Sequence, residues 1–141
     1  MARKAPSQVR SDLPRRTSRK VARAVVPGVS SRTLAEISRI EHRRSELGAA
    51  YRALSTWRAM VYRRGPWVIY PSWYRDCPCC EPDGGDDREI LEAFCHLLTR
   101  RAARELRAVL APLDARFLAR TLADPYAPAG DPWWRRRMET A

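Results

Sequence analysis

The sequence lacks any apolar run near the roughly 18 residues that a membrane-spanning helix needs, so we expect no transmembrane segment. Its basic start is not followed by an apolar stretch long enough for a secretory signal. It also lacks the glycine-rich phosphate loop, the H-E-x-x-H motif and the G-x-S-x-G motif, which leaves nucleotide, metalloprotease and esterase chemistry without support. No internal repeat is visible. We therefore expect a cytoplasmic protein that is not an enzyme and has no membrane partner.

Lysine is nearly absent, because Lys4 and Lys20 are the two lysines among 27 basic residues and the others are arginine. With 16 acidic residues, the formal net charge of the 141-residue chain is +11 at pH 7. A surface of this sign favours nucleic acid or an acidic protein as partner, and the arginine fork binds phosphate or carboxylate bidentately. Codon usage in a GC-rich genome produces the same arginine excess, so the excess by itself does not identify the partner.

Much of this charge lies at the N-terminal end of the chain. Residues 1–29 contain eight basic residues, one acidic residue and few large apolar side chains, so they cannot bury enough surface to fold. We expect a disordered basic tail that neutralises phosphates, or else a solvated terminus without a specific partner. With two arginines of the following helix, the candidate nucleic-acid contacts are Arg10, Arg15, Arg16, Arg19, Lys20, Arg23, Arg43 and Arg44.

The pattern after the tail predicts an all-α fold in a single domain over residues 30–126. Apolar residues recur every three or four positions, which predicts a long helix over 33–64 that begins at a capping box formed by Thr33 and Glu36. The same spacing predicts two shorter helices, packed on the first, over residues 87–110 and 112–123. A first helix of about thirty residues would reach ~45 Å, so part of it could pair with a second copy of the chain.

Residues 65–86 join the predicted helices and contain an aromatic segment that we expect to be extended, as a strap across the helices. Its rings either stack on unpaired bases or, as we favour, cover the core; they are Trp67, Tyr70, Trp73 and Tyr74. Residues 127–141 are predicted to be a tail rich in tryptophan and arginine. This tail is either a docking peptide for an acidic or nucleic-acid surface or a frayed end whose tryptophans fold back.

All four cysteines and one of the two histidines lie between residues 77 and 96. Cys77 and Cys80 have the C-x2-C spacing of a zinc knuckle, and the further candidate ligands are Cys79, Cys95 and His96. Neighbours on a helix diverge by ~100°, so Cys95 and His96 cannot easily bind the same ion. The alternatives to a structural zinc site are inert buried cysteines and a reactive thiol, which the acidic surroundings disfavour.

Together these patterns predict a non-catalytic nucleic-acid-binding or accessory protein that uses the arginine-rich tail and helix faces to bind DNA or RNA. The Cys/His loop would stabilise the helical hairpin, with zinc as the candidate cofactor. The alternative is a protein–protein adaptor or small structural component, homodimeric or not, that binds an acidic partner. A thiol-dependent enzyme is a third and weaker hypothesis.

Overall fold

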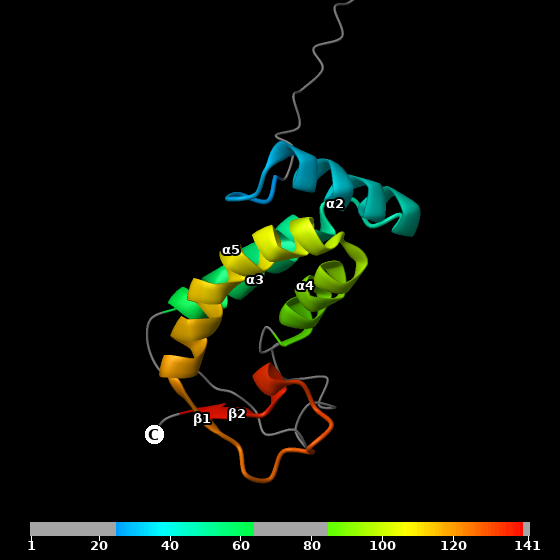
Figure 1. Ribbon diagram of the computed structural model, residues 1–141. Coiled ribbons are helices and arrows are strands. Elements are labelled where there is room, and N and C mark those ends of the chain that lie inside the picture. The colour runs from blue at the N-terminus through cyan, green and yellow to red at the C-terminus, as the bar shows by residue number, and fades with distance from the viewer. Residues whose placement is uncertain (1–24, 64–84, 140–141) are drawn as a thin grey trace, which may run out of the picture.

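A computed structural model describes residues 25–63 and 85–139 of the chain. Within these ranges the protein is mostly helical, as predicted, with four α-helices and a small two-stranded sheet (Figure 1). Most of the segment over 65–86, with the strap, and most of the tail over 1–29 lie outside the described residues; residues 85 and 86 begin α4. In chain order, the elements are α2 (Ser31–Arg44), α3 (Ala49–Tyr62), α4 (Gly85–Leu97), α5 (Arg100–Ala119), β1 (Thr121–Ala123), the 3-10 helix η2 (Trp133–Arg135) and β2 (Arg137–Glu139).

The helix predicted over residues 33–64 is wrong as a continuous element, because the structure divides it into α2 and α3. The chain turns between Ser45, the C-cap of α2, and Gly48, the N-cap of α3. Their φ angles of 57° and 76° are left-handed and interrupt the helical backbone. The apolar spacing runs on through the turn, which is why it suggested one helix. However, Leu47, in the turn, is 60% exposed and contributes little to the core.

The predicted start of this helix is also displaced by three residues. Ser30 is the N-cap of α2, and its side chain accepts a hydrogen bond from the backbone amide of Thr33. Thr33 is buried and lies in the first turn, so it is not the capping residue. Ser30 and Thr33 are both suitable caps by residue type, and the spacing to Glu36 favoured the wrong one.

The helices predicted over 87–110 and 112–123 begin and end elsewhere. Their boundary lies at Thr99, which caps α5 by accepting a hydrogen bond from a backbone amide in its first turn. Pro112, predicted as the start of a helix, lies inside α5 on its exposed side. Leu113, next to it, is 2% exposed in the core, and such packing holds the helix together across the hydrogen bond that proline removes.

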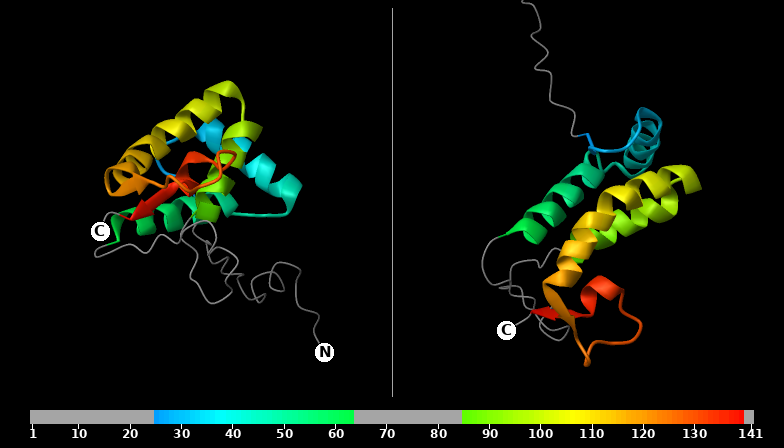
Figure 2. Two further views of the ribbon diagram at one scale, coloured as in Figure 1. Left: turned by 90° about the horizontal axis from the view of Figure 1, so that it is seen from below. Right: turned by 60° about the vertical axis from the view of Figure 1, so that its left-hand side comes forward.

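The hydrophobic core lies where α3 packs against α4 and α5. Trp57 of α3 is fully buried, and its ring centroid lies 5.0 Å from that of Phe117 in α5. Figure 1 and the right-hand view of Figure 2 show α2 at one end of the molecule and the two-stranded sheet at the opposite end. The other large apolar residues at the centre are Leu54, Val61, Leu91, Phe94, Leu106, Leu110 and Leu113.

The C-terminal segment predicted as a tail over 127–141 is ordered as far as it is described. Its strand β2 pairs antiparallel with β1, so Leu122 lies opposite Met138. Trp134 in η2 is buried, and Arg135 forms ion pairs with Asp86 and Glu89 near the start of α4. Trp134 is thus folded back onto the helices, as in one of the two alternatives, but the segment is not frayed, because β2 pairs with β1.

Candidate anion-binding groove

Three arginines lie along one face of α2 and form what we call the arginine stripe. Arg32, Arg39 and Arg43 are seven and four residues apart, about two turns and one turn, so they lie within a narrow sector of the helix. All three are exposed, and none forms an ion pair with a carboxylate among the described residues. The Arg39 Nε donates to the carbonyl oxygen of Ala35, 3.2 Å away, which leaves its terminal nitrogens available.

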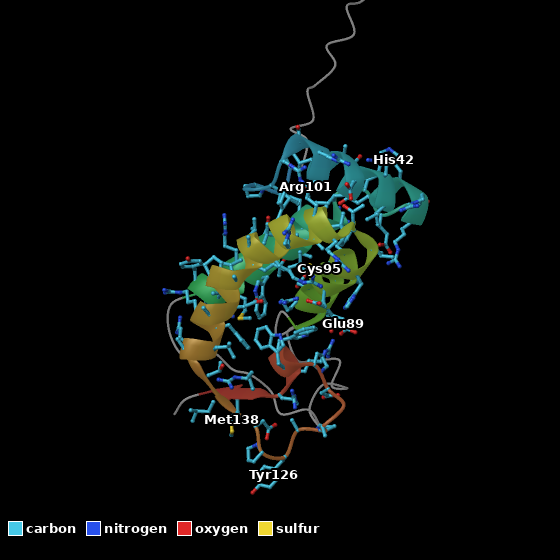
Figure 3. All side chains as sticks on the ribbon, in the orientation of Figure 1. His42, Glu89, Cys95, Arg101, Tyr126 and Met138 are labelled. Atoms are coloured by element: carbon cyan, nitrogen blue, oxygen red, sulfur yellow. The ribbon has the colours of Figure 1, made fainter. Side chains whose placement is uncertain are left out.

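The arginine stripe borders an open groove of about 750 Å³ between α2 and the corner where α4 meets α5. From the corner, Leu97 and Thr99 form the opposite wall, and Leu97 is 46% exposed. Figure 3 shows His42 and Arg101 at this end of the molecule, far from Tyr126 and Met138. The residues that line the groove are Arg32, Glu36, Ser38, Arg39, Ile40, His42, Arg43, Leu97 and Thr99.

Helices α2 and α5 are joined by an exchange of carboxylates. Glu36 of α2 accepts hydrogen bonds from the backbone amide and the hydroxyl of Thr99, at 3.2 Å and 2.8 Å. In return, Glu105 of α5 accepts hydrogen bonds from the Ser30 amide at 2.8 Å and the Thr33 hydroxyl at 2.7 Å. Each helix therefore supplies a negative charge to the positive N-terminal end of the other, where the helix dipole favours it.

A third carboxylate, that of Glu41, binds backbone amides at the start of α3 in the same way. Glu41 is buried and accepts hydrogen bonds from the backbone amides of Gly48 at 3.0 Å and Ala50 at 3.1 Å. Glu36, Glu41 and Glu105 therefore each accept hydrogen bonds from groups at the N-terminal end of a helix. Of the three, Glu105 also contacts an arginine, Arg101 of α5, at 3.7 Å. Within the described ranges, the carboxylates near the arginine stripe thus form no ion pair with its three arginines.

The Glu105 carboxyl is held in its ionised form by these bonds. The backbone amide of Ser30, followed by the side chains of Ser30 and Thr33, lowers the pKa of Glu105 from 4.5 to about 2. Hydrogen bonds to a carboxylate favour the charged form in this way. The bonds that Glu105 accepts are therefore charge-assisted at neutral pH and sensitive to strong acid.

Two of the predicted nucleic-acid contacts lie in the described part of the chain, and the structure separates them. Arg43 belongs to the arginine stripe, whereas Arg44 is exposed on another face, ~100° around the helix, and does not line the groove. Arg32 and Arg39 were missed. Their spacing from Arg43, eleven and four residues, places all three arginines on one face of a helix. The sequence therefore contained a signal for the stripe, in the arrangement of basic residues on the exposed side of this helix.

The structure places Cys95 and His96 in different surroundings. Cys95 (Figure 3) is 3% exposed in the core and is a free thiol, whereas the side chain of His96 is 72% exposed and lies 3.4 Å from Glu92. This separation agrees with the expectation that both cannot easily bind one ion. In residues 25–63 and 85–139, no group of three or more histidine, cysteine, aspartate or glutamate residues could hold a metal. The predicted zinc site remains a prediction, because its other ligands lie outside the described residues.

The surroundings of Cys95 disfavour a reactive thiolate. Burial raises the pKa of the Cys95 thiol, and the negative charge of Glu92 raises it further, against smaller opposing effects of Arg107 and Arg88. Reactive cysteines have the opposite setting, with a lowered pKa and partial exposure. Cys95 is therefore suited to packing between helices.

Sequence analysis also missed a buried charge network at the centre of the molecule. Arg88 of α4 is 4% exposed and binds both carboxylate oxygens of Asp114 in α5 at 3.0 to 3.2 Å. It also donates to Glu92 at 3.0 Å, and its guanidinium carbon lies 4.6 Å from the ring centroid of Trp134. The indole of Trp57 donates to Asp114 at 3.1 Å. The network joins α3, α4, α5 and η2, and its partners are so far apart in sequence that no motif signals it.

The remaining predicted site residues lie outside the described ranges: Arg10, Arg15, Arg16, Arg19, Lys20, Arg23, Trp67, Tyr70, Trp73, Tyr74, Cys77, Cys79 and Cys80. Among the described residues, no helix combines the length and apolar character needed to cross a bilayer. Comparisons with protein-family models, curated proteins and solved structures found no match to this chain, so the groove is assessed from its own geometry and charge.

Proposed function

We propose that this protein binds nucleic acid without catalysing a reaction and that the arginine stripe is the folded part of its interface. The observation that carries the proposal is the stripe itself: three exposed arginines on one helix face, with no ion-pair partner in the part of the chain that the structure describes. The nearby carboxylates are occupied at helix N-termini, so an external anion is the natural partner of these guanidinium groups.

The dimensions of the stripe suit a polyanion better than a single small ion. From Arg32 to Arg43 the helix rises ~16 Å, at 1.5 Å per residue. Successive phosphates of one stacked strand are about 3.4 Å apart along the axis, so the stripe spans roughly five nucleotides. Arginine can bind such phosphates bidentately, and each contact releases condensed counterions.

The segment that precedes the described residues supports the same proposal. Residues 1–24 contain eight basic residues and one acidic residue, and they lead into α2 at the Arg32 end of the stripe. The described residues also remain basic, with 17 arginines and 12 acidic residues, a net charge of +5. The tail and the folded part would therefore contribute to one positive surface.

This proposal predicts a steep salt dependence that the stripe helps to set. The logarithm of the affinity for an oligonucleotide should fall linearly with the logarithm of salt concentration. Changing Arg39 and Arg43 together to Gln should reduce the magnitude of that slope by about 2, because two phosphate contacts are lost. Fluorescence anisotropy with a labelled oligonucleotide at several salt concentrations measures both quantities.

The matched control changes Arg58 and Arg136 together to Gln, since both are exposed arginines that do not line the groove. It alters the total charge equally and should leave the slope nearly unchanged. An absent or salt-independent affinity would contradict the proposal. So would a nuclease-treated pull-down that recovers one stoichiometric acidic protein while no oligonucleotide binds, which is the result that the adaptor hypothesis predicts.

A further inference from the structure

The groove differs from a purely electrostatic surface because its two walls have different chemistry. The α2 wall carries the guanidinium groups of Arg32, Arg39 and Arg43, whereas the corner between α4 and α5 presents Leu97. Leu97 is the last residue of α4 and is 46% exposed, and Ile40 lies at the base of the groove. A large apolar side chain that faces unpaired arginines indicates a ligand with both a charged and an apolar face.

Double-stranded and single-stranded nucleic acids differ in whether they offer such a pair of faces. A duplex exposes its phosphates but keeps the flat faces of its bases stacked inside, so a protein reaches only base edges in the grooves. A single strand exposes phosphates and unstacked base faces together, and proteins bind it with basic grooves and side chains against which bases pack. The two walls of this groove correspond to those two parts of a single strand.

We propose that the groove binds single-stranded nucleic acid, with the phosphates along the arginine stripe and a base packed against Leu97. This inference rests on the proposed function and specifies its substrate class. The groove, at about 750 Å³, falls in the size range of pockets that enclose small ligands. Its floor therefore takes one or two nucleotides, while the longer stripe contacts the flanking phosphates. Arginine side chains can also stack on the exposed bases.

The experiment compares a labelled single-stranded oligonucleotide with the same oligonucleotide annealed to its complement, at one salt concentration, by fluorescence anisotropy. The wild-type chain should bind the single strand at least tenfold more tightly. Leu97→Ala should weaken single-strand binding about fivefold, because a packed base loses the apolar area that the leucine side chain covers, and should leave duplex binding unchanged.

The matched control is Leu118→Ala, since Leu118 of α5 is 42% exposed and does not line the groove. It should leave single-strand binding unchanged. Leu97→Gln provides a second variant that keeps most of the side-chain volume while removing the apolar contact. It should weaken single-strand binding in the same direction, and circular dichroism confirms that each variant is folded.

The outcomes separate this inference from the proposed function. Equal or tighter binding of the duplex, with the expected salt slope, would overturn the single-strand inference and leave the proposed function in place. Unchanged single-strand binding by both Leu97 variants would also overturn it. If neither oligonucleotide binds, and an acidic peptide such as polyglutamate binds instead, the proposed function itself is wrong.

Discussion

Glu36 illustrates how the use of one carboxylate determines what its neighbours can bind. By sequence spacing it lies four residues after Arg32 and three before Arg39, positions at which ion pairs form on a helix. In the structure it turns instead to the amide and hydroxyl of Thr99. The two arginines are left exposed, without an ion-pair partner among the described residues.

The corresponding carboxylate of α5 leads to a pH-dependent prediction. Glu105→Gln should lower the melting temperature at neutral pH, and this difference should shrink as the pH falls from 4.5 towards 2. The folded carboxyl has a pKa of about 2, below its usual value of 4.5, so between these values the unfolded chain takes up a proton that the folded chain does not. The stability that Glu105 contributes is therefore present above pH 4.5 and lost as the pH falls through about 2.

Thermal unfolding followed by circular dichroism across this pH range tests the prediction. Glu46→Gln is the control, because Glu46 is an exposed glutamate in the turn between α2 and α3. The control should unfold like the wild type at neutral pH. A difference between Glu105→Gln and wild type that stays constant over the whole pH range would show that the carboxylate charge is not responsible.

Among the elements, the turn between α2 and α3 gives the sharpest distinction between the sequence pattern and the structure. The backbone at Gly48 has a φ of 76°, which a residue with a side chain adopts only with strain. Gly48→Ala should therefore destabilise the protein by about 1 kcal/mol. If residues 33–64 formed one continuous helix, the same substitution would stabilise it by about 0.5–1 kcal/mol, so the two arrangements predict opposite signs.

Ser45→Gly is the complementary variant, since Ser45 has a φ of 57° in the same turn. It should stabilise the protein by up to about 1 kcal/mol, because glycine adopts the left-handed conformation without strain. This gain exceeds the cost of the larger backbone entropy that glycine loses on folding. Urea unfolding measures both free energies. Opposite results for the two variants would show that the break in the helix is misplaced.

For the whole molecule, the network around Arg88 joins four of the described elements, α3, α4, α5 and η2. Arg88→Met should destabilise the protein by about 3 kcal/mol, because Asp114, whose side chain is 16% exposed, would lose its charged partner in a largely desolvated position. Burial already raises the pKa of Asp114, even though the hydrogen bonds from Arg88 and Trp57 act to lower it. Arg88→Met together with Asp114→Leu should cost much less than the two single changes added together.

A double-mutant cycle by urea unfolding provides the measurement. Arg58→Met is the matched control on an exposed arginine and should change the free energy of unfolding by no more than about 0.5 kcal/mol. Additive effects of the Arg88 and Asp114 substitutions would contradict the idea that the pair acts as a unit.

The helical class of the molecule was predictable because apolar residues such as Ile37, Leu54 and Leu106 follow the helical period and do lie in the core. The helix ends were not, because the period continues across the turns at Gly48 and Thr99. There the ends depend on backbone conformation and on carboxylates that come from other segments.

The candidate site was predictable only in part, for a similar reason. The sequence identified Arg43 as a basic contact, but membership of the stripe depends on which face of α2 is buried. Whether its arginines stay without an ion pair depends equally on Glu36, whose hydrogen-bond donors lie 63 residues away at Thr99. The central Arg88 network escaped notice because a charged residue in a polar-looking segment gives no sign of burial.

The exchange of carboxylates between α2 and α5 has a consequence for how the chain folds. Forming the first turn is the costly step in helix formation. Here the N-terminal groups of α2 donate hydrogen bonds to a carboxylate of α5, and those of α5 donate to a carboxylate of α2. Neither helix alone has all of these stabilising bonds, so the two should form cooperatively rather than one after the other. Because the partners are more than sixty residues apart, this non-local step should slow folding relative to a bundle of independently capped helices.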